Sequence, residues 1–477
     1  MAAKSTLNAK NLEALGAGRL SELLLEISAG NAAAKRRLRL ELAGATNPEE
    51  IAKEVRKRLA AIARSRSFVD WQKRRAFIDD LETQRTAIFE KVARVDVVEA
   101  FELMWRFLAL AEPVYGRCDD SSGNLGEIFS AAIVNLGELA LLAQPCVEKL
   151  ADRTLDALTI NGYGQYDRLI ANLAPALGDK GLERLKRQVI ELSKEKIEKT
   201  GHKDRQAKGY SSGRSFLADD PREHSRKSLV KHALMAIADA QGDVDAFIAQ
   251  HDTKTKKSPA IAAEIADRLI AAGRAKEALK ILEAAERREG WVDIDWVDAR
   301  IAALEALGQT EEAQEARLDC FEKCLSPDHL RAYLQRLPDF DDEEAEIKAL
   351  DHAMSADSSH HALAFLVNWP ALDRAARLTI ERAHELDGDL YELLTPAAQL
   401  LAGKYPLAAT VMLRAMIDFS LGKARSSRYR HAARHLKECT SLAANIEDYQ
   451  TFENHDAFIH RLKKEHGRKS GFWNLIE

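Results

Sequence analysis

Leu269-Ile270-Ala271-Ala272-Gly273-Arg274-Ala275-Lys276-Glu277-Ala278 is followed along the chain by a related stretch, Leu304-Glu305-Ala306-Leu307-Gly308-Gln309-Thr310-Glu311-Glu312-Ala313. The two glycines are 35 residues apart, a spacing close to that of tetratricopeptide-type helical hairpins. Each stretch ends an apolar-striped helix, turns at the glycine and opens a second helix with charged residues and a small alanine. Because one such hairpin cannot bury its own apolar face, the pattern predicts stacked neighbours.

The composition favours an almost entirely helical chain. Of the 477 residues only 11 are proline and 24 are glycine, while strong helix formers are abundant. We found no stretch in which apolar and polar residues alternate with a period of two, so we expect no sheet of any size. The length allows two or three domains or one long repeat array.

Several helices have recognisable starts. Asn47-Pro48-Glu49-Glu50 places a cap, a proline and two acids where a helix to about Arg66 begins. Ser258-Pro259 and Ser326-Pro327 give the same signal in the repeat region. From Asp96 to Leu110 the apolar residues recur with helical periodicity over a wide face, which predicts a central buried helix.

The domain prediction follows from where the apolar stripe is interrupted. Between residues 196 and 228 the chain is rich in Lys, Arg, Gly and Ser, as in Lys208-Gly209-Tyr210-Ser211-Ser212-Gly213-Arg214. We therefore predict an all-α fold, with an N-terminal helical domain at 1–195, a basic linker at 196–228 and a tetratricopeptide-like α-solenoid at 229–477.

Four short stretches resemble an uncharacterised bacterial family of helical proteins: Gly162 to Asp167, Ala174 to Gly178, Pro406 to Met416, and Lys469 to Trp473. The repeat half is also similar to the helical C-terminal region of SWIM zinc-finger proteins, with the turn Ala272 to Ala278 as its clearest feature. The zinc finger itself is missing, because the chain has no Cys-x-Cys pair. The resemblance therefore implies a helical-repeat fold and transfers no catalytic residue.

Two side-chain patterns invite a chemical interpretation near the C-terminus. His431, His435 and Cys439 are spaced four residues apart, so they follow one helical face and three such groups can bind zinc. The simpler alternative is that the histidines line a basic surface and Cys439 faces the core. Arg430 and His435 match the Arg-x4-His pattern of a class of helical ribonucleases, but so short a pattern arises readily by chance. We assign no catalytic, metal or cofactor-binding residue.

Charge is more informative than any motif. Residues 35–75 hold thirteen Lys and Arg against five acids, and residues 184–214 hold ten against four, in a chain whose net charge is −5. A third basic tract covers 421–469, where Arg428, Arg430 and Arg434 are our candidate partner-binding residues. Such segregation either attracts phosphate backbones or pairs basic with acidic helix faces inside the solenoid or across a dimer. We favour the pairing.

The predicted function is a non-enzymatic scaffold that presents a helical-repeat groove to a protein or peptide partner. The alternative is a nucleic-acid-binding protein that uses the three basic tracts, and a ribonuclease is a distant third. We found no signal peptide near Met1 and no run of 18 apolar residues, so we expect a cytoplasmic protein without a membrane span. The five cysteines lack a disulfide framework spacing. The oligomeric state does not follow from the sequence.

Overall fold

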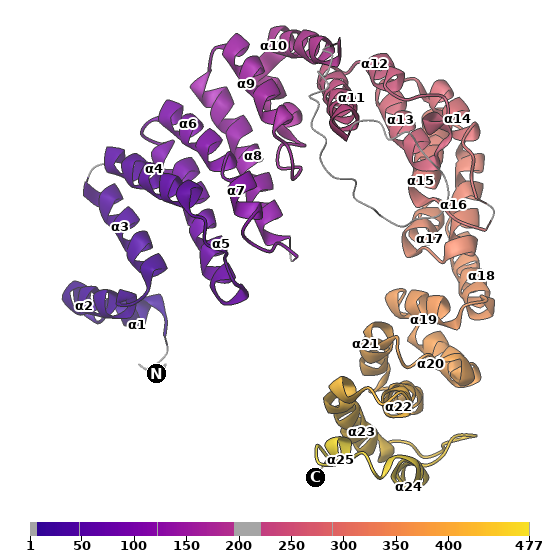
Figure 1. The fold of residues 1–477 in the computed structure, drawn as a ribbon. Coiled ribbons are helices and arrows are strands. Elements are labelled where there is room, and N and C mark those ends of the chain that lie inside the picture. Colours follow the sequence, from indigo (N-terminus) through magenta and orange to yellow (C-terminus); the bar gives the residue numbers. More distant parts are fainter. Residues whose placement is uncertain (1–6, 47, 122, 195–220, 289, 477) are drawn as a thin grey trace, which may run out of the picture. The chain divides into compact units, whose positions relative to one another are not determined.

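The structure, a computed structural model, is built from helices throughout the residues it describes, which are 7–46, 48–121, 123–194, 221–288 and 290–476. Within these ranges there is no strand, and one isolated bridge joins Val69 to Cys118. The prediction of an all-α fold is therefore confirmed. The chain divides into two compact units, Met1–His251 and Asp252–Glu477 (Figure 1).

Unit 1 is built from α-helices over its described residues. Its α-helices are α1 Ala9–Glu13, α2 Gly16–Ser28, α3 Ala32–Thr46, α4 Pro48–Arg64, α5 Trp71–Thr86, α6 Val97–Leu108, α7 Ala111–Tyr115, α8 Asn124–Ala143, α9 Val147–Thr159, α10 Leu169–Lys194, α11 Pro221–Gln241 and α12 Val244–Ala249. A π-helical turn, Ala87–Val92, continues α5. The predicted start at Pro48 is confirmed, while the predicted cap residue Asn47 lies outside the described residues.

The predicted central helix is α6. The Asp96 carboxylate accepts a hydrogen bond from the Glu99 backbone N–H at 2.9 Å and so caps its first turn. Leu103, Met104 and Phe107 are fully buried, and α6 packs against α8 in the middle of unit 1. Its neighbour α8 has, among the described residues, the length and apolar composition of a membrane span. Since 56% of its most apolar window is buried in unit 1, α8 serves here as a core helix.

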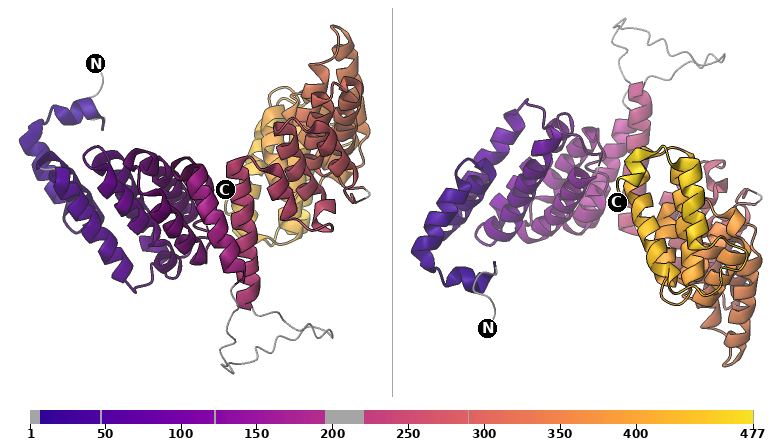
Figure 2. Two further views of the ribbon diagram at one scale, coloured as in Figure 1. Left: turned by 90° about the horizontal axis from the view of Figure 1, so that it is seen from above. Right: turned by 90° about the horizontal axis from the view of Figure 1, so that it is seen from below.

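Helix α11 packs with unit 1. Its apolar residues Leu229, Ala233 and Ile237 join the core that α6, α8 and α10 form, and α10 and α11 lie side by side (Figure 2). The predicted repeat domain began at residue 229, whereas the compact unit begins at Asp252. The difference arises because a periodic apolar stripe shows that a helix has a buried face without showing which helix covers it. Most of the predicted linker at 196–228 lies outside the described residues.

Unit 2 contains thirteen α-helices among its described residues. They are α13 Pro259–Ala271, α14 Ala275–Glu283, α15 Ile294–Ala306, α16 Thr310–Cys324, α17 Pro327–Leu334, α18 Asp341–Ser355, α19 Ser359–Asn368, α20 Leu372–Glu381, α21 Tyr391–Leu401, α22 Pro406–Gly422, α23 Tyr429–Ala443, α24 His455–His466 and α25 Ser470–Trp473. The helix starts expected at Pro259 and Pro327 are confirmed.

The two glycines that predicted helical hairpins lie in identical turns. Gly273 separates α13 from α14 and Gly308 separates α15 from α16, with φ angles of 74° and 76°. In the first turn the Arg274 N–H donates to the Leu269 carbonyl at 2.7 Å, and in the second the Gln309 N–H donates to the Leu304 carbonyl at 2.9 Å. A backbone hydrogen bond that spans six residues, with a residue of left-handed conformation among them, defines the Schellman motif.

Helices of unit 2 pack mainly on their neighbours in the sequence. α13 packs on α14 and α15, α15 packs on α16, and α21 packs on α22, which in turn packs on α23. The largest apolar core of the unit extends from Phe321 of α16 to Phe472 of α25. The three helices α21, α22 and α23 leave a hollow between them, which is the pocket described next.

Candidate functional site

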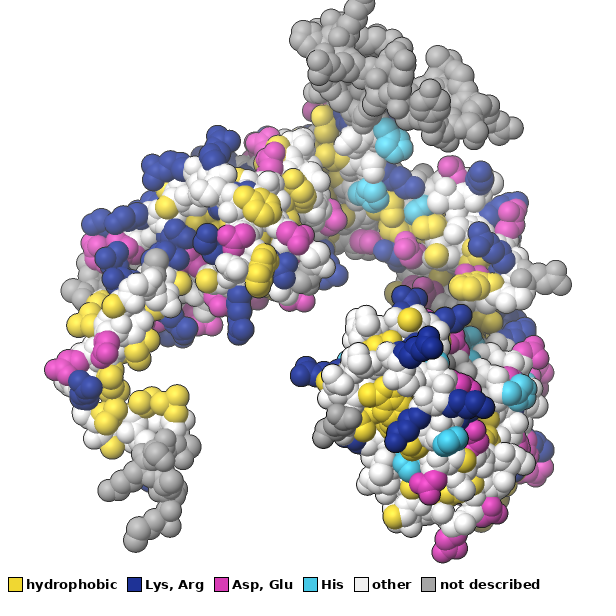
Figure 3. Space-filling model, turned by 60° about the horizontal axis from the view of Figure 1, so that its bottom comes forward, with side chains coloured by type: hydrophobic (Ala, Val, Ile, Leu, Met, Phe, Trp, Pro, Cys, Tyr) yellow, Lys and Arg dark blue, Asp and Glu magenta, His cyan; other side chains and the backbone are white. Residues whose placement is uncertain are grey.

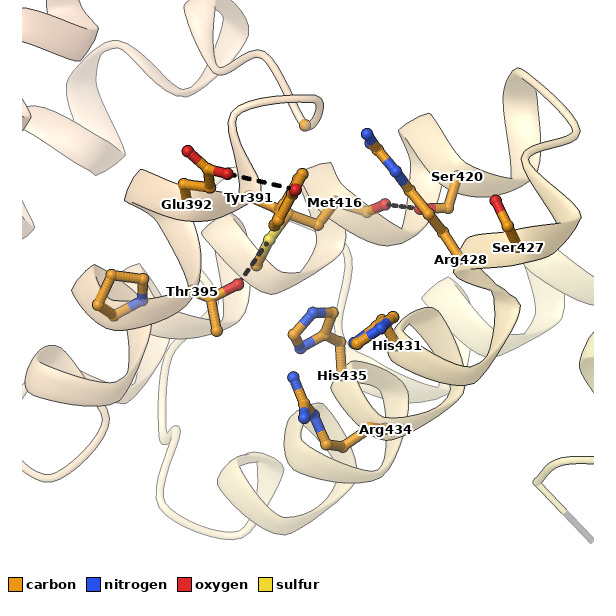
Figure 4. Close-up of a pocket in the computed structure, with 12 residues that line it drawn as sticks. Tyr391, Glu392, Thr395, Met416, Ser420, Ser427, Arg428, His431, Arg434 and His435 are labelled. Atoms are coloured by element: carbon orange, nitrogen blue, oxygen red, sulfur yellow. Dashed lines mark hydrogen bonds between the residues drawn. The ribbon is translucent and has the colours of Figure 1, made fainter. Parts of the chain in front are cut away.

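Helices α21, α22 and α23 border a pocket of about 400 Å³ (Figure 4). This volume falls in the range of small-ligand and side-chain pockets. α21 and the loop before it form one wall, α22 forms the floor, and α23 with the turn before it forms the other wall. The lining residues are Gly388, Tyr391, Glu392, Thr395, Pro396, Met416, Ser420, Ser427, Arg428, His431, Arg434 and His435.

The wall at α23 carries four basic or titratable side chains. Arg428 directly precedes the helix, and His431, Arg434 and His435 follow at steps of three, three and one residues. At 100° per residue these steps keep all four on one side of the helix. Figure 4 shows them extending from α23 toward α21.

Arg428 is held in place by contacts with the opposite wall and with α22. Its Nη1 donates a hydrogen bond to Asp389 Oδ1 at 2.6 Å. Its guanidinium carbon lies 4.8 Å from the centre of the Tyr391 ring and 5.6 Å from that of Phe419. The ion pair neutralises the charge and the aromatic contacts fix the orientation, so Arg428 joins the two walls.

His435 is a neutral group at the back of the pocket. It is 4% exposed, and its Nδ1 lies 3.2 Å from Glu438 Oε2. Burial lowers the pKa of His435 below its ordinary value, and this effect outweighs the hydrogen bond to Glu438, which raises the pKa. When Nδ1–H donates to Glu438, the neutral ring leaves Nε2 as an acceptor.

Arg434 and His431 keep donor capacity for a ligand. Arg434 Nε lies 3.6 Å from Glu438 Oε1, which is beyond hydrogen-bond distance, and half of the side chain is exposed. His431 is exposed on the same wall. These two side chains can therefore turn toward a ligand without breaking a buried interaction.

The floor and the α21 wall are apolar with a few satisfied polar groups. Met416 is 2% exposed; the Thr395 hydroxyl donates to its sulfur at 3.5 Å, and the Ser420 hydroxyl donates to its carbonyl at 2.8 Å. The Tyr391 hydroxyl donates to Glu392 Oε1 at 3.3 Å. Glu392 is the one carboxylate among the lining residues, all of which the structure describes.

A glycine allows the two sides of the pocket to meet. A Cβ atom at Gly388 would lie 2.2 Å from the Ala415 carbonyl oxygen of α22, so only glycine fits this close approach. The approach places the next residue, Asp389, where it pairs with Arg428. Gly388 thus determines the position of the loop that carries the partner of Arg428.

The lining groups offer recognition chemistry. Arg434 and His431 donate hydrogen bonds, His435 Nε2 and Glu392 accept them, and Met416 and Pro396 provide apolar contact. The recorded hydrogen bonds of Ser420 and Thr395 go to Met416, and neither residue is bonded to a histidine of the pocket. Ser427, the other serine of the lining, has no hydrogen bond to a histidine among the described residues, so the lining contains no bonded serine–histidine pair of the kind that activates a nucleophile.

Comparison with known protein families identifies the family of this chain. The profile of a family of unknown function, DUF6880, matches residues 2–475. The chain belongs to this family. The expectation of an uncharacterised family is confirmed, and membership in DUF6880 assigns no role to any residue. No curated protein matches the sequence.

The pocket of this DUF6880 chain includes two of the three predicted partner-binding residues. Arg428 and Arg434 line it, whereas Arg430 is exposed outside it. Five residues correspond to a rotation of about 140° around a helix, so Arg430 and His435 point in different directions. The structure does not bring together the pair that matched the ribonuclease pattern.

The predicted metal ligands have separate environments. His431 is exposed and His435 lines the pocket, but Cys439 is fully buried in the core and burial raises its pKa to about 12. Among the described residues no group of three or more His, Cys, Asp or Glu side chains has a spacing that holds a metal. The part of the alternative interpretation that places Cys439 in the core is confirmed, but His435 is buried and does not lie on the surface.

Much of the charge in the basic tracts is paired within each unit. Figure 3 shows Lys and Arg interspersed with Asp and Glu on unit 1, and apolar side chains bordered by Lys, Arg and His on unit 2. In tract 35–75 the paired side chains are Arg36, Lys53, Arg56, Lys57, Arg58, Lys73 and Arg74. In tract 421–469 Arg461 pairs with three acids, Asp418, Glu453 and Glu465. Tract 184–214 lies mostly outside the described residues.

The α21 and α22 side of this DUF6880 pocket has no functional signal in the sequence. Tyr391, Glu392 and Met416 lie on helices whose apolar pattern indicates burial and nothing more. The one local signal was Asp387-Gly388-Asp389, an acidic turn around a glycine that is now explained by the approach to Ala415 and the pairing with Arg428.

Proposed function

We propose that the chain is a helical-repeat binding scaffold, and that the pocket between α21, α22 and α23 holds a peptide segment of a protein partner. The observation that carries the proposal is that the pocket is preformed. Arg428 fixes the position of its two walls relative to each other, while the N–H donors of Arg434 and His431 remain available to a ligand. Pre-organisation of this kind lowers the entropic cost of binding.

The repeat architecture is part of the same proposal. It is supported by the identical turns at Gly273 and Gly308 and by the sequential packing of α13, α14, α15 and α16. Tetratricopeptide-like arrays bind partners through surfaces made of successive hairpins. The similarity to the helical region of SWIM proteins belongs to this proposal, as does a cytoplasmic location, which five free cysteines support.

The lining chemistry favours a peptide that presents an apolar side chain next to a carboxylate. The apolar side chain would contact Met416 and Pro396, and the carboxylate would accept hydrogen bonds from Arg434 and His431. Glu392 on the opposite wall would accept from a backbone N–H of the peptide and would repel a second acid. The motif expected is therefore one acid with apolar neighbours, rather than an acidic run.

The test is selection of peptides from a random displayed library on the immobilised full chain. Affinities of the selected peptides would then be measured by fluorescence anisotropy. Arg434→Ala should weaken binding about tenfold or more, since a hydrogen bond to a charged group contributes about 1.5–3 kcal/mol. Arg430→Ala is the matched control, because this exposed arginine lies one turn away on α23 and outside the pocket. Selected peptides without acid enrichment, or equal losses in the two variants, would refute the proposal.

Nucleic-acid binding stays the second proposal. It is supported by Arg64, Arg66 and Arg75 in tract 35–75, which are exposed and have no ion pair with an acid among the described residues. Binding of this kind weakens steeply as salt rises. Absence of any shift of labelled RNA or DNA at about 50 mM salt would exclude it.

A further inference from the structure

Unit 1 contains a second pocket, of about 720 Å³, that no proposal above uses. It lies among α3, α4, α5 and the segment that follows α4, and it also includes Arg117. Three arginines line it, Arg36, Arg58 and Arg117, but only one buried carboxylate, Asp80. All of its lining residues belong to unit 1, so it is a different pocket from the one bordered by α21, α22 and α23.

Asp80 is shared by two of the arginines. Its side chain is 4% exposed, and Oδ2 accepts hydrogen bonds from Arg58 Nε at 2.9 Å and Nη2 at 2.5 Å. The same oxygen lies 3.1 Å from Arg36 Nη2. One negative charge thus faces two positive charges, and Arg36 Nε is buried without a hydrogen-bond partner.

Arg117 has no carboxylate partner among the described residues. It is 9% exposed, and its two terminal nitrogens donate to the backbone carbonyls of Ser67 and Ile62, both at 3.3 Å. Its guanidinium carbon lies 4.9 Å from the centre of the Phe77 ring, and its Nε is buried without a hydrogen-bond partner. A buried cation held only by neutral dipoles and a ring face is an incomplete arrangement.

The charged form of Arg117 is destabilised in this cluster. Burial lowers the pKa of Arg117 below its ordinary value, and the like charge of Arg58 lowers it further. The remaining basic group of the lining, Lys73, is neutralised by Asp70 at 3.0 Å. The pocket therefore carries an excess of two positive charges, since three arginines face one carboxylate.

We propose that this pocket of unit 1 binds a phosphate monoester through Arg36, Arg58 and Arg117. A phosphate monoester carries a charge of about −1.5 to −2 at pH 7, which matches the excess, whereas a carboxylate or a phosphodiester carries only one. Guanidinium groups bind phosphate oxygens in paired hydrogen bonds, as Lys does not.

The space and the rim admit an organic group beyond the phosphate. The volume exceeds that of a phosphate ion several-fold, and it falls in the range of pockets that hold whole small molecules. Phe68 lines the pocket and is 68% exposed, so its ring offers a flat apolar surface at the mouth. Aromatic rims of this kind stack on planar rings. A nucleoside monophosphate and a 5′-phosphorylated nucleic-acid end share the required chemistry.

The experiment is titration calorimetry of the full chain with five probes. These are inorganic phosphate, adenosine 5′-monophosphate, adenosine, and a short oligonucleotide with and without a 5′-phosphate. Phosphate and the monophosphate should bind, adenosine should not, and binding should weaken from pH 7.5 to 5.5 as the phosphate, with its second pKa of about 6, takes up a proton. If the 5′-phosphorylated oligonucleotide binds more tightly than the monophosphate, the phosphate monoester that the pocket recognises belongs to a nucleic-acid end.

Variants link the signal to the cluster. Arg117→Met and the more exposed Arg36→Gln should each weaken binding of the monophosphate about tenfold or more. Circular dichroism would verify the fold, and Arg36→Gln keeps the test valid if Arg117→Met does not fold. Arg37→Gln is the matched control, because Arg37 is exposed on α3 next to Arg36 but does not line the pocket.

Three results would overturn the proposal. The first is no binding of any phosphate probe at millimolar concentration. The second is equal weakening by Arg37→Gln and Arg36→Gln, which would indicate attraction to the basic surface in general. The third is an oligonucleotide that binds equally with and without its 5′-phosphate, which would instead favour the phosphodiester backbone and the nucleic-acid proposal.

Discussion

The Asp80 carboxylate is buried against the Arg58 guanidinium and accepts two of its hydrogen bonds. Removing the charge should leave Arg36, Arg58 and Arg117 without a carboxylate in the same pocket. Breaking a buried ion pair from one side costs about 3–5 kcal/mol, so we expect Asp80→Asn to lower the stability of unit 1 by that amount. Hydrogen exchange of α3, α4 and α5 measures the loss.

The neighbouring residue supplies the control for this prediction. Asp79 is exposed, so Asp79→Asn should leave exchange unchanged within about 0.5 kcal/mol. Inorganic phosphate should also protect the wild type against exchange in these helices, because a ligand stabilises the state that binds it. Equal effects of the two substitutions would show that Asp80 is not the counter-ion of the cluster.

Gly388 should be intolerant of even one methyl group. In Gly388→Ala the new Cβ would meet the Ala415 carbonyl oxygen at 2.2 Å, so the loop must leave α22. We expect a loss of about 1–3 kcal/mol, as for other overpacked positions, and weaker binding of pocket peptides because Asp389 no longer reaches Arg428. Gly403→Ala is the comparison: no atom lies within 4 Å of its added Cβ. A Gly388→Ala protein as stable as Gly403→Ala would contradict the packing described for this loop.

His435 should titrate below the ordinary histidine value of about 6.5, because burial disfavours its charged form. NMR titration of the imidazole protons measures this pKa. Glu438→Gln should lower the pKa of His435 further, since the carboxylate favours protonation.

The sign of the effect on stability follows from the depressed pKa. Above about pH 6.5 the ring is neutral in both the folded and the unfolded chain, so the stability is complete. As the pH falls below that value, the unfolded chain binds a proton first and stability is lost until the folded pKa is passed. His435→Gln should reduce this loss, measured as the difference in unfolding free energy between pH 7.5 and 5.5. His455, whose pKa burial also lowers, should account for part of what remains.

Cys324 should be the reactive member of a thiol pair. Its Sγ lies 3.8 Å from Cys320 Sγ. When Cys320 donates the hydrogen bond between the two sulfurs, it lowers the pKa of Cys324 to about 7 and raises that of Cys320. Because the thiolate is the nucleophile, alkylation of Cys324 should rise to half its maximum near pH 7. Peptide-level mass spectrometry follows the labelling, with exposed Cys146 as an internal reference.

Cys320→Ala tests the cause of this reactivity. Without the hydrogen bond the pKa of Cys324 should return toward the ordinary thiol value of about 8.5, so its labelling curve should move to higher pH. An unchanged curve in Cys320→Ala would mean that the neighbouring thiol is not responsible.

Local signals in the sequence predicted local structure well. The glycines at 273 and 308, the prolines at 48, 259 and 327, and the wide apolar face after Asp96 each correspond to the expected turn, helix start or buried helix. These features depend on the conformational freedom of glycine, the fixed φ of proline and the helical period, which act within a few residues.

Both pockets depend on contacts that no local pattern encodes. Arg36, Asp80 and Arg117 come from three separate segments, and Arg428 meets Asp389 across 39 residues. Likewise, Arg430 and Arg434 are equivalent by composition, and only the packing of α23 determines that Arg434 lines the pocket and Arg430 does not. The charge count of tract 35–75 was correct. It could not show that Asp80, an acid outside the tract, neutralises part of the positive charge of the tract.

The pocket of unit 2 takes its walls and floor from three successive helices, α21, α22 and α23. Because the helices of unit 2 pack mainly on their neighbours in the sequence, its terminal helices can unfold one after another from the end. A ligand that contacts all three helices links their unfolding, since opening any one of them releases it. Occupancy would therefore convert gradual fraying of the C-terminal end into a single cooperative transition, and the half-life of this end against proteolysis would report the concentration of the partner.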